Sequence, residues 1–157
     1  MSYLVTSHKT PIGTLNLLAD DQILIGANLS SIADFNAAGE FKIVKSIPII
    51  SDLVHEYFAG DLTALNGIQV RQPGAKFSQA AWKAMRKIAV GMAWTYSDLA
   101  KKAGSPAAVR AAGSACANNA IMLVVPCHRI VRTGGALGNY ASGVEKKRWL
   151  LSHEGFL

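Results

Sequence analysis

The feature that most limits the fold of this chain of 157 residues is a change at Arg71 in both the sign of the charge and the spacing of apolar residues. Residues 1–70 carry three basic and seven acidic side chains and no arginine, whereas residues 71–157 carry thirteen basic and three acidic ones. The first part alternates short apolar runs with turn residues, which is typical of strands, and the second repeats apolar residues at helical spacing. The sequence therefore predicts an α+β protein with a scaffold domain at residues 1–70, a linker at 71–76 and a second domain at 77–157.

The first domain is expected to be a small antiparallel sheet with at least one helix. Pro11-Ile12-Gly13 and Asp20-Asp21 are turn sequences between apolar runs, so they predict a hairpin followed by a third strand. A helix is expected over residues 48–58, with Ser46 as its N-cap and Gly60 after its end. The expected strands are residues 3–6, 15–18, 23–27 and 67–70.

The second domain is expected to be mainly helical, with a winged-helix-like helix-turn-helix. Residues 95–104 and 105–115 predict two helices joined by a glycine-bearing turn, with Ser105 as the second N-cap and Pro106 in its first position. Arg110 is the only long polar side chain of the second helix, and its small neighbours permit a partner to approach the backbone. The alternative is a helix that is simply packed, because alanine is the best helix former. Elsewhere we expect a helical segment through Phe77, Ala81, Met85 and Ile88 that Gly91 closes, a buried strand or extended segment at 121–125, and a helix at 144–153.

The net charge of +6 is concentrated in the second domain, which suggests a polyanion such as a nucleic acid as partner. The alternative is a basic surface without a partner. The longest apolar run, residues 120–125, is too short for a membrane span, and the N-terminus carries no secretory signal. Cys116 and Cys127 are the only cysteines and form no CxxC, which excludes a disulfide scaffold and favours a reducing compartment. We expect a cytoplasmic or nucleoid-associated protein, without membrane association and without a zinc site in the first domain.

Cys127 has the surroundings of a reactive thiol. It follows the apolar segment and Pro126, and it precedes His128 and Arg129. Nearby positive charge favours the thiolate, which is the nucleophilic form, and the proline helps to fix the turn. The alternative is a buried structural thiol, the usual state of free cysteine and the role we assign to Cys116. His128 is a candidate base, but neighbouring side chains of an extended chain point apart, so a bridging water is needed.

The sequence Pro126-Cys127-His128-Arg129-Ile130 resembles the active-site motif of the O6-alkylguanine-DNA alkyltransferases, also called methylated-DNA–protein-cysteine methyltransferases. The N-terminal sequence Thr10-Pro11-Ile12-Gly13-Thr14-Leu15 resembles the first hairpin of that family. The resemblance is strong over residues 77–155 and weak over residues 1–70. The other residues whose positions fit the layout of the family are Phe77-Ser78-Gln79, Trp82, Tyr96, Arg110, Asn119, Tyr140 and Glu154.

The resemblance implies a DNA-repair protein that moves an alkyl group from O6-alkylguanine, and from O4-alkylthymine, to its own cysteine. Cys127 would attack the alkyl carbon and guanine would leave. Glu154 would orient His128, which would deprotonate the thiol through a water, and Tyr96 would donate a proton to N3 of guanine. Asn119 would hold the loop before the nucleophile. Because the thioether has no ready leaving reaction, each molecule would act once, and no cofactor or metal is needed.

The resemblance also implies how double-stranded DNA is bound. The family extrudes the target base and docks its second helix in the minor groove, so Arg110 would fill the gap in the stack. The protein is expected to be monomeric when it is not on DNA. Contacts to the DNA backbone are implied for Tyr96, Ser97, Ser105 and Thr133, and a base pocket is implied for Ile130, Tyr140, Ala141 and Ser142.

Two positions depart from the commonest pattern of the family. Asn118-Asn119-Ala120 stands where Asn-Pro is frequent, and Ala141 stands where many relatives have serine or glycine near O6. The second change removes one hydrogen bond to the leaving oxygen, which affects substrate preference and rate rather than the reaction. Two other functions stay open: a module that binds the lesion without transferring the alkyl group, and an unrelated cysteine hydrolase. Stoichiometric methylation of Cys127 distinguishes the alkyltransferase from both.

Overall fold

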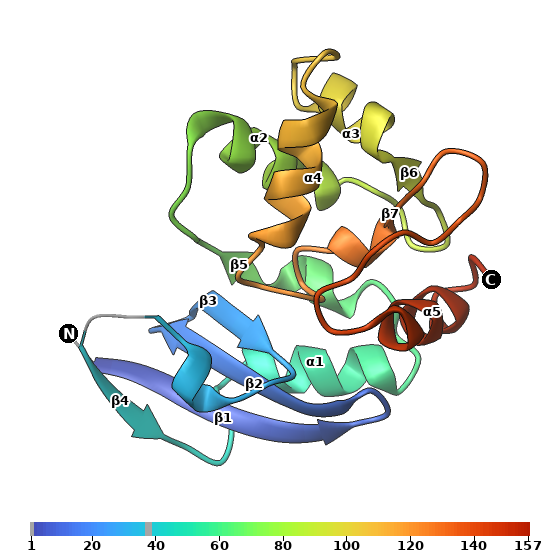
Figure 1. Cartoon of the computed structure of the whole chain (residues 1–157). Coiled ribbons are helices and arrows are strands. Elements are labelled where there is room, and N and C mark those ends of the chain that lie inside the picture. The colour runs from blue at the N-terminus through green and yellow to red at the C-terminus, as the bar shows by residue number, and fades with distance from the viewer. Residues whose placement is uncertain (1, 37–38) are drawn as a thin grey trace. The chain divides into compact units, whose positions relative to one another are not determined.

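The structure is a computed structural model that describes residues 2–36 and 39–157. It divides into two compact units, Met1–Gln72 and Pro73–Leu157 (Figure 1). Arg71, placed in the expected linker, belongs to the first unit, where its Nη2 lies 2.7 Å from Oδ2 of Asp20. Within the described residues, no helix has the length and apolar character needed to cross a membrane.

The first unit is built on a sheet of five strands in the order β4-β1-β2-β3-β5. Their bounds are β1 Ser2–Thr10, β2 Gly13–Asp20, β3 Ile23–Asn28, β4 Glu40–Ile43 and β5 Gln69–Val70. The three central strands are antiparallel, as expected, but β4 runs parallel to β1 and β5 runs parallel to β3. The prediction of an antiparallel sheet is therefore wrong at both edges. The edge strands are reached by longer connections through 3-10 helix η1 (Ile32–Asp34) and α1 (Ile50–Phe58), and such crossovers permit parallel pairing.

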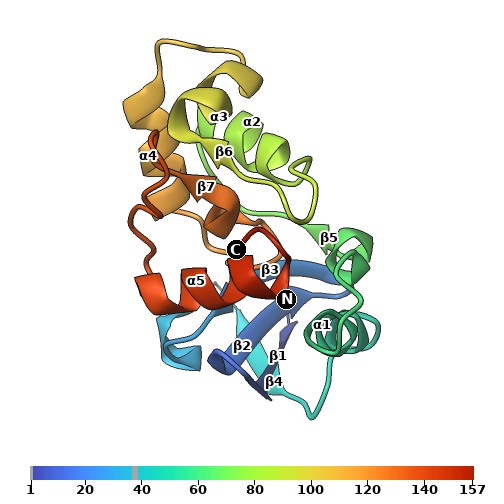
Figure 2. The same cartoon turned by 90° about the vertical axis from the view of Figure 1, so that its right-hand side faces the viewer.

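Local chemistry explains the hairpin and the start of α1. Gly13 adopts a φ of +117° in the β1–β2 turn, which favours glycine over other residues. Figures 1 and 2 show α1 along one face of the sheet, and His8 of β1 reaches Ser51 of α1 at 2.8 Å. The prediction that Ser46 caps this helix is wrong, because α1 begins at Ile50 and the hydroxyl of Ser51 accepts the backbone N–H of Ile47 at 2.8 Å.

The second unit contains four α-helices, one short 3-10 helix and a two-stranded parallel sheet. The bounds are α2 Lys76–Met85, α3 Tyr96–Lys102, α4 Val109–Ala117, α5 Val144–His153, β6 Trp94–Thr95 and β7 Ile130–Val131. The indole Nε1 of Trp82 in α2 donates to the carbonyl of Ala115 in α4 at 2.9 Å, which ties these two helices together. The α+β fold class is confirmed, and α5 has the expected bounds. Gly91 lies beyond the end of α2, so the expected helical segment stops earlier, at Met85.

The helix-turn-helix is formed by α3 and α4, but only α3 starts as its sequence suggests. Thr95 and Asp98 form a reciprocal capping box at the N-terminus of α3. The expectation that Ser105 caps the second helix is wrong, because α4 begins only at Val109 and has no side-chain cap. The carbonyl of Ser105 instead accepts the backbone N–H of Ala108 at 2.9 Å, which closes a turn before the helix.

The apolar segment before Cys127 is buried but is not extended. Residues 121–125 fold into turns, and Leu123 has a φ of +74°. The side chain of Asn119 satisfies two backbone groups of this segment, because Oδ1 accepts from Ile121 N at 3.1 Å and Nδ2 donates to Val125 O at 2.9 Å. The expected strand is therefore replaced by a turn that delivers Cys127 into the short 3-10 helix η3, Cys127–Arg129.

Candidate functional site

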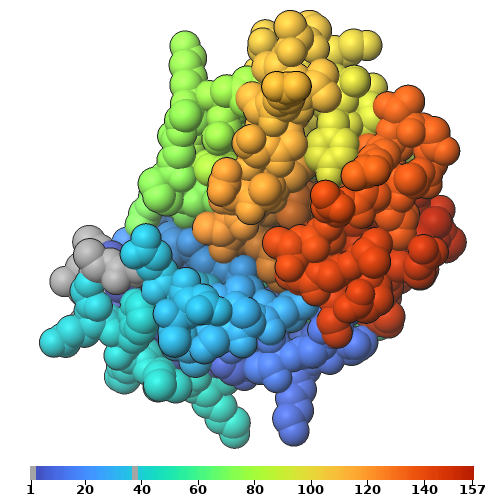
Figure 3. Space-filling view, in the orientation of Figure 1, coloured from blue at the N-terminus to red at the C-terminus, as the bar shows by residue number. Residues whose placement is uncertain are grey.

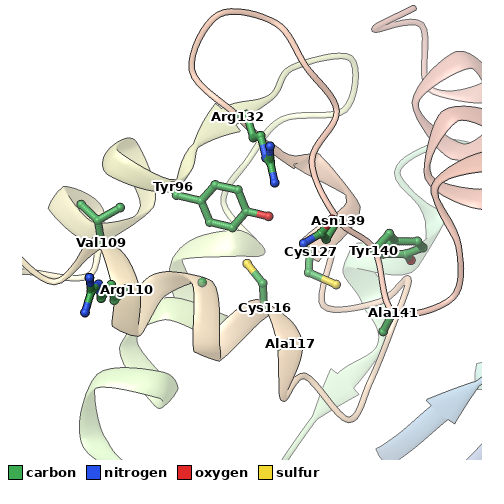
Figure 4. Close-up of a pocket in the computed structure, with 11 residues that line it drawn as sticks. Tyr96, Val109, Arg110, Cys116, Ala117, Cys127, Arg132, Asn139, Tyr140 and Ala141 are labelled. Carbon is green, nitrogen blue, oxygen red and sulfur yellow. The ribbon is translucent and has the colours of Figure 1, made fainter.

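The candidate site is a pocket of roughly 540 Å³ in the second unit (Figure 4). Its walls come from α3, from α4, from η3 and from the glycine-rich segment that precedes α5. The pocket contains residues that the sequence predicted for the site and others that it did not. The lining residues are Tyr96, Val109, Arg110, Gly113, Cys116, Ala117, Cys127, Arg132, Asn139, Tyr140 and Ala141.

Cys127 is the buried thiol of this pocket, with 8% of its surface exposed. The side-chain Nδ2 of Asn119 donates to its Sγ at 3.4 Å. Burial raises the pKa of the Cys127 thiol, while the Asn119 hydrogen bond and the positive charge of Lys147 oppose that increase. Asn119 and Lys147 therefore stabilise the thiolate, but a base is still needed to remove the proton from the thiol.

His128 is held in one orientation by buried charges behind the pocket. Its Nε2 lies 2.8 Å from Oε2 of Glu154, and Arg129 donates to both oxygens of the same carboxylate, at 2.8 and 3.1 Å. Burial alone would raise the pKa of Glu154, but the hydrogen bonds and charges of His128 and Arg129 outweigh burial and hold it well below its usual range. Glu154 is thus a carboxylate to which the Nε2–H of His128 donates.

The same burial decides the protonation state of His128. Burial lowers the pKa of this imidazole, and the contribution of Glu154 in the opposite direction does not compensate. A neutral imidazole with its proton on Nε2 carries a lone pair on Nδ1. Among the described residues, no hydrogen-bond partner reaches this buried Nδ1. His128 is therefore a candidate base. It follows Cys127 within the 3-10 helix η3, whereas the sequence predicted an extended chain here.

Lys147 is a site residue that the sequence did not reveal. It is fully buried in α5, and its Nζ donates to the carbonyl of Ile130 at 2.6 Å and to that of Asn139 at 3.3 Å. Burial lowers the pKa of Lys147, and the neighbouring Cys127 and Cys116 raise it. The lysine thus places positive charge near the thiol and connects β7 to the pocket wall. A signal existed in the sequence, because Lys147 shares the helical face of the buried Leu150.

The other wall of the pocket brings Tyr96, Arg132 and Cys116 together (Figure 4). Burial raises the pKa of Tyr96, as do Cys116 and Cys127, whereas the positive charge of Arg132 lowers it. Cys116 is half-buried rather than sealed in the core, and burial, together with Cys127, raises the pKa of its thiol to about 12. Sequence reasoning assigned no role to Arg132 and treated Cys116 as structural.

The remaining expected residues lie around the pocket without lining it. Ser97 follows Tyr96 in α3, Ser105 lies in the turn before α4, and Thr133 lies exposed after β7. Ile130 is completely buried and presents its carbonyl to Lys147, while Ser142 follows Ala141 outside the pocket lining. No group of three or more His, Cys, Asp or Glu side chains in the described ranges is arranged to hold a metal ion.

Comparison with known proteins assigns the family. Residues 76–156 match the family described as 6-O-methylguanine DNA methyltransferase, DNA binding domain. The methylated-DNA–protein-cysteine methyltransferase of Shigella flexneri is 36% identical over 94% of this chain and 93% of its own length. The chain belongs to the methylated-DNA–protein-cysteine methyltransferase family. The expected family, and with it a DNA-repair methyltransferase, is confirmed.

Solved structures of methyltransferases agree with this assignment. The O6-methylguanine methyltransferase of Mycobacterium tuberculosis superposes with a TM-score of 0.87 at 30% identity, covering 98% of this chain and 93% of that chain. The same bacterium's protein in complex with DNA matches with a TM-score of 0.86 at 30% identity, covering 99% and 93%. All residues of the pocket and of the His128–Glu154 pair fall inside the segment that matches the methyltransferase DNA-binding domain.

Proposed function

We propose that Cys127 accepts the alkyl group of O6-alkylguanine in double-stranded DNA, in a single irreversible transfer. The observation that carries this proposal is the placement of the thiol. Cys127 lines an open pocket, its sulfur accepts a hydrogen bond from Asn119, and its neighbour His128 is a neutral imidazole anchored by Glu154. This is the arrangement of a nucleophile, a base and a group that orients the base.

The reaction balances with the groups present. The thiol proton passes to Nδ1 of His128 through a solvent molecule, and the Cys127 sulfur attacks the alkyl carbon. The new S–C bond forms as the C–O6 bond breaks, and guanine leaves with the bonding electrons. Tyr96, whose hydroxyl points into the pocket in Figure 4, donates a proton to N3 of the leaving guanine. The resulting thioether has no leaving group that water displaces readily, so the protein acts once.

The surface around the pocket is suited to DNA. α4 and the segment between β7 and α5 lie on one face of the second unit (Figure 3). Arg110 of α4 and Thr133 of that segment are both exposed. Extrusion of a base costs a few kcal/mol of lost stacking and pairing. Arg110 of α4 is among the residues that line the pocket, and its guanidinium is directed away from Cys127 (Figure 4). From there it enters the minor groove and fills the gap that the extruded base leaves in the stack. Ser97 and Ser105 complete the contacts to the phosphate backbone.

Tyr140 and Ala141 line the pocket, and we infer that the backbone near Ile130 and Ser142 completes the site for the base. Ala141 has no hydroxyl to donate to O6, so recognition depends on backbone groups and on the shape of the pocket. We expect a pocket of this kind to bind O6-alkylguanine and also O4-alkylthymine, which presents a comparable alkylated oxygen. We place this activity in a monomer that works in the cytoplasm or on the nucleoid, where the thiol stays reduced.

Intact-protein mass spectrometry tests the proposal. The protein is mixed with an O6-methylguanine duplex, beside the variants Cys127→Ser and Cys116→Ser. We expect a gain of one methyl group per molecule in the wild type and in Cys116→Ser, located on Cys127, and plain guanine in the DNA. Binding of the duplex without any methyl gain would instead identify a lesion-binding module. Continued turnover of an ester or amide by Cys127 would identify a hydrolase.

A further inference from the structure

The proposed reaction uses one thiol, but the pocket contains two. Cys116 lies in the last turn of α4 and lines the same pocket as Cys127. Both thiols are free, and the described residues contain no other cysteine. Figure 4 shows the two side chains on adjacent parts of the wall, the Cys116 sulfur directed towards Tyr96 and the Cys127 sulfur towards Ala141. Alkyl transfer alone does not explain a second thiol at this place.

We propose that peroxide converts Cys116 and Cys127 into an intramolecular disulfide, which closes the pocket and reversibly protects the alkyl acceptor. A disulfide needs Cα atoms about 4.4–6.8 Å apart and side chains that turn towards each other. Both cysteines line one pocket, so the proposal requires each side chain to turn about χ1 until its sulfur faces the other. Cys116 lies one residue before the end of α4, and helix ends open locally more easily than helix centres.

The two thiols have different parts in this reaction. The Cys127 sulfur accepts a hydrogen bond from Asn119 and lies near the charge of Lys147, so its thiolate is the better stabilised one. Cys127 is therefore oxidised first, and Cys116 is the resolving thiol. Susceptibility to peroxide follows thiolate character in this way, and sensor cysteines are often placed next to a resolving cysteine.

The chemistry is a two-electron oxidation by hydrogen peroxide. The Cys127 thiolate attacks one peroxide oxygen, the O–O bond breaks, and the products are a sulfenic acid and hydroxide. The Cys116 thiolate then attacks the Cys127 sulfur, and the S–O bond breaks as the S–S bond forms. The hydroxide leaving group takes up a proton and becomes water. In total, two thiols and one peroxide give one disulfide and two waters, and an external dithiol reverses the change by exchange.

The consequence concerns the fate of the acceptor under oxidative stress. Without a resolving thiol, a sulfenic acid proceeds to sulfinic and sulfonic acids, which are irreversible for a protein of this kind. A disulfide across the pocket occupies the Cys127 sulfur and excludes a base, so the molecule is inactive until it is reduced. Only this consequence rests on the proposed function, since disulfide formation does not require alkyl transfer.

The test treats the full chain with stepwise hydrogen peroxide and then blocks free thiols with an alkylating agent under denaturing conditions. The variants Cys116→Ser and Cys127→Ser are treated in parallel, and circular dichroism checks that each is folded. In the wild type we expect a monomer that has lost two hydrogens, a peptide that joins Cys116 to Cys127, and both thiols recovered after dithiothreitol. In Cys116→Ser we expect sulfinic and sulfonic acid on Cys127, which dithiothreitol does not reverse.

Methyl transfer after peroxide, expressed relative to each untreated protein, provides a second readout. We expect full recovery with dithiothreitol in the wild type and permanent loss in Cys116→Ser. The inference is overturned if the wild type gives only overoxidised Cys127, only disulfides between molecules, or two unmodified thiols. A joined peptide in a protein that never accepts a methyl group would support the disulfide and refute the proposed function, so the two failures are distinct.

Discussion

The carboxylate of Glu154 accepts a hydrogen bond from Nε2 of His128 at 2.8 Å, although the two residues stand 26 positions apart in the chain. Arg129 donates hydrogen bonds from Nε and Nη2 to the same carboxylate, and its Nη1 donates to the carbonyl of Ile88 at 2.9 Å. The side chains of His128 and Glu154 are completely shielded from solvent. His128, the neighbour of Cys127, is thus held by Glu154 directly after α5, and the same carboxylate forms an ion pair with Arg129.

Glu154→Gln is expected to impair both transfer and folding. The amide removes the negative charge that anchors His128, and general-base catalysis typically contributes about 10²–10⁴-fold. Arg129 is left as a buried cation without its partner, which costs about 3–5 kcal/mol. Single-turnover rates with a methylated duplex and urea unfolding measure the two effects. Glu145→Gln, which changes an exposed carboxylate in the first turn of α5, is the matched control and should change neither the transfer rate nor the unfolding free energy.

Acidification is expected to lower the free energy of unfolding through the same cluster. The pKa values of His128 and Glu154 both lie below their ordinary values in the folded state, so the unfolded chain binds more protons as pH falls. Stability is therefore lost below about pH 6.5 through His128 and further below about pH 4.3 through Glu154. Urea unfolding between neutral and acid pH checks this. His128→Gln should reduce the upper part of the dependence without abolishing it, because burial also lowers the pKa of His8.

Asn119→Asp is expected to move the reaction to higher pH. The change keeps the acceptor for the backbone N–H of Ile121, removes the donor to the Cys127 sulfur and adds a negative charge. Both latter effects raise the pKa of the thiol, so less thiolate is present at neutral pH. A hydrogen bond to a charged group contributes about 1.5–3 kcal/mol, which corresponds to a shift of about one pH unit or more. The pH profile of the transfer rate measures it, with Asn118→Asp as the control for added charge.

Lys147→Met is expected to separate activity from stability. Methionine fills a similar volume without burying a charge, although two carbonyls lose a donor, so the change in unfolding free energy should stay within about 1–3 kcal/mol. The thiol loses nearby positive charge, which raises its pKa, and the wall between Ile130 and Asn139 loses its connection. We expect the transfer rate at neutral pH to fall about tenfold or more. Equal rates in Lys147→Met and the control Lys146→Met would contradict this role.

Arg110→Ala is expected to affect DNA but not the chemical step. Arg110 is exposed at the mouth of the pocket and makes no bond to Cys127 in the described structure. If its side chain replaces the extruded base, the variant should react more slowly with a methylated duplex, by an amount that reflects a few kcal/mol of extrusion cost. The rate with free O6-methylguanine base should be unchanged. An equal loss with both substrates would assign Arg110 to the pocket itself.

The sequence was most informative where structure depends on neighbours along the chain. The bounds of α5 follow from its own residues, and the hairpin turn at Gly13 needs only a glycine. The edge strand β4 was not foreseen, because four exposed residues show no alternation. The start of α4 was misplaced, because Ser105 and Pro106 resemble a cap but fold into a turn before the helix.

The site shows the same division. The motif around Cys127, together with the spacing of Tyr96, Asn119 and Glu154, identified the family from the sequence alone and predicts Cys127 as the nucleophile. That Asn119 bonds to the sulfur itself, rather than only holding its loop, became visible in three dimensions. The part played by Arg129 and Lys147 was also hidden, because a charged side chain in a sequence is normally taken to be solvated.

The sequence by itself thus determined which thiol lies in the motif of the family, where the chain changes from strands to helices and which family it belongs to. Only the tertiary structure decided which charges are buried against that thiol and that Cys116 shares its pocket. The physical reason is that motifs and helical periodicity are local along the chain. Burial, protonation and the pairing of two thiols depend instead on segments that meet only when the chain has folded.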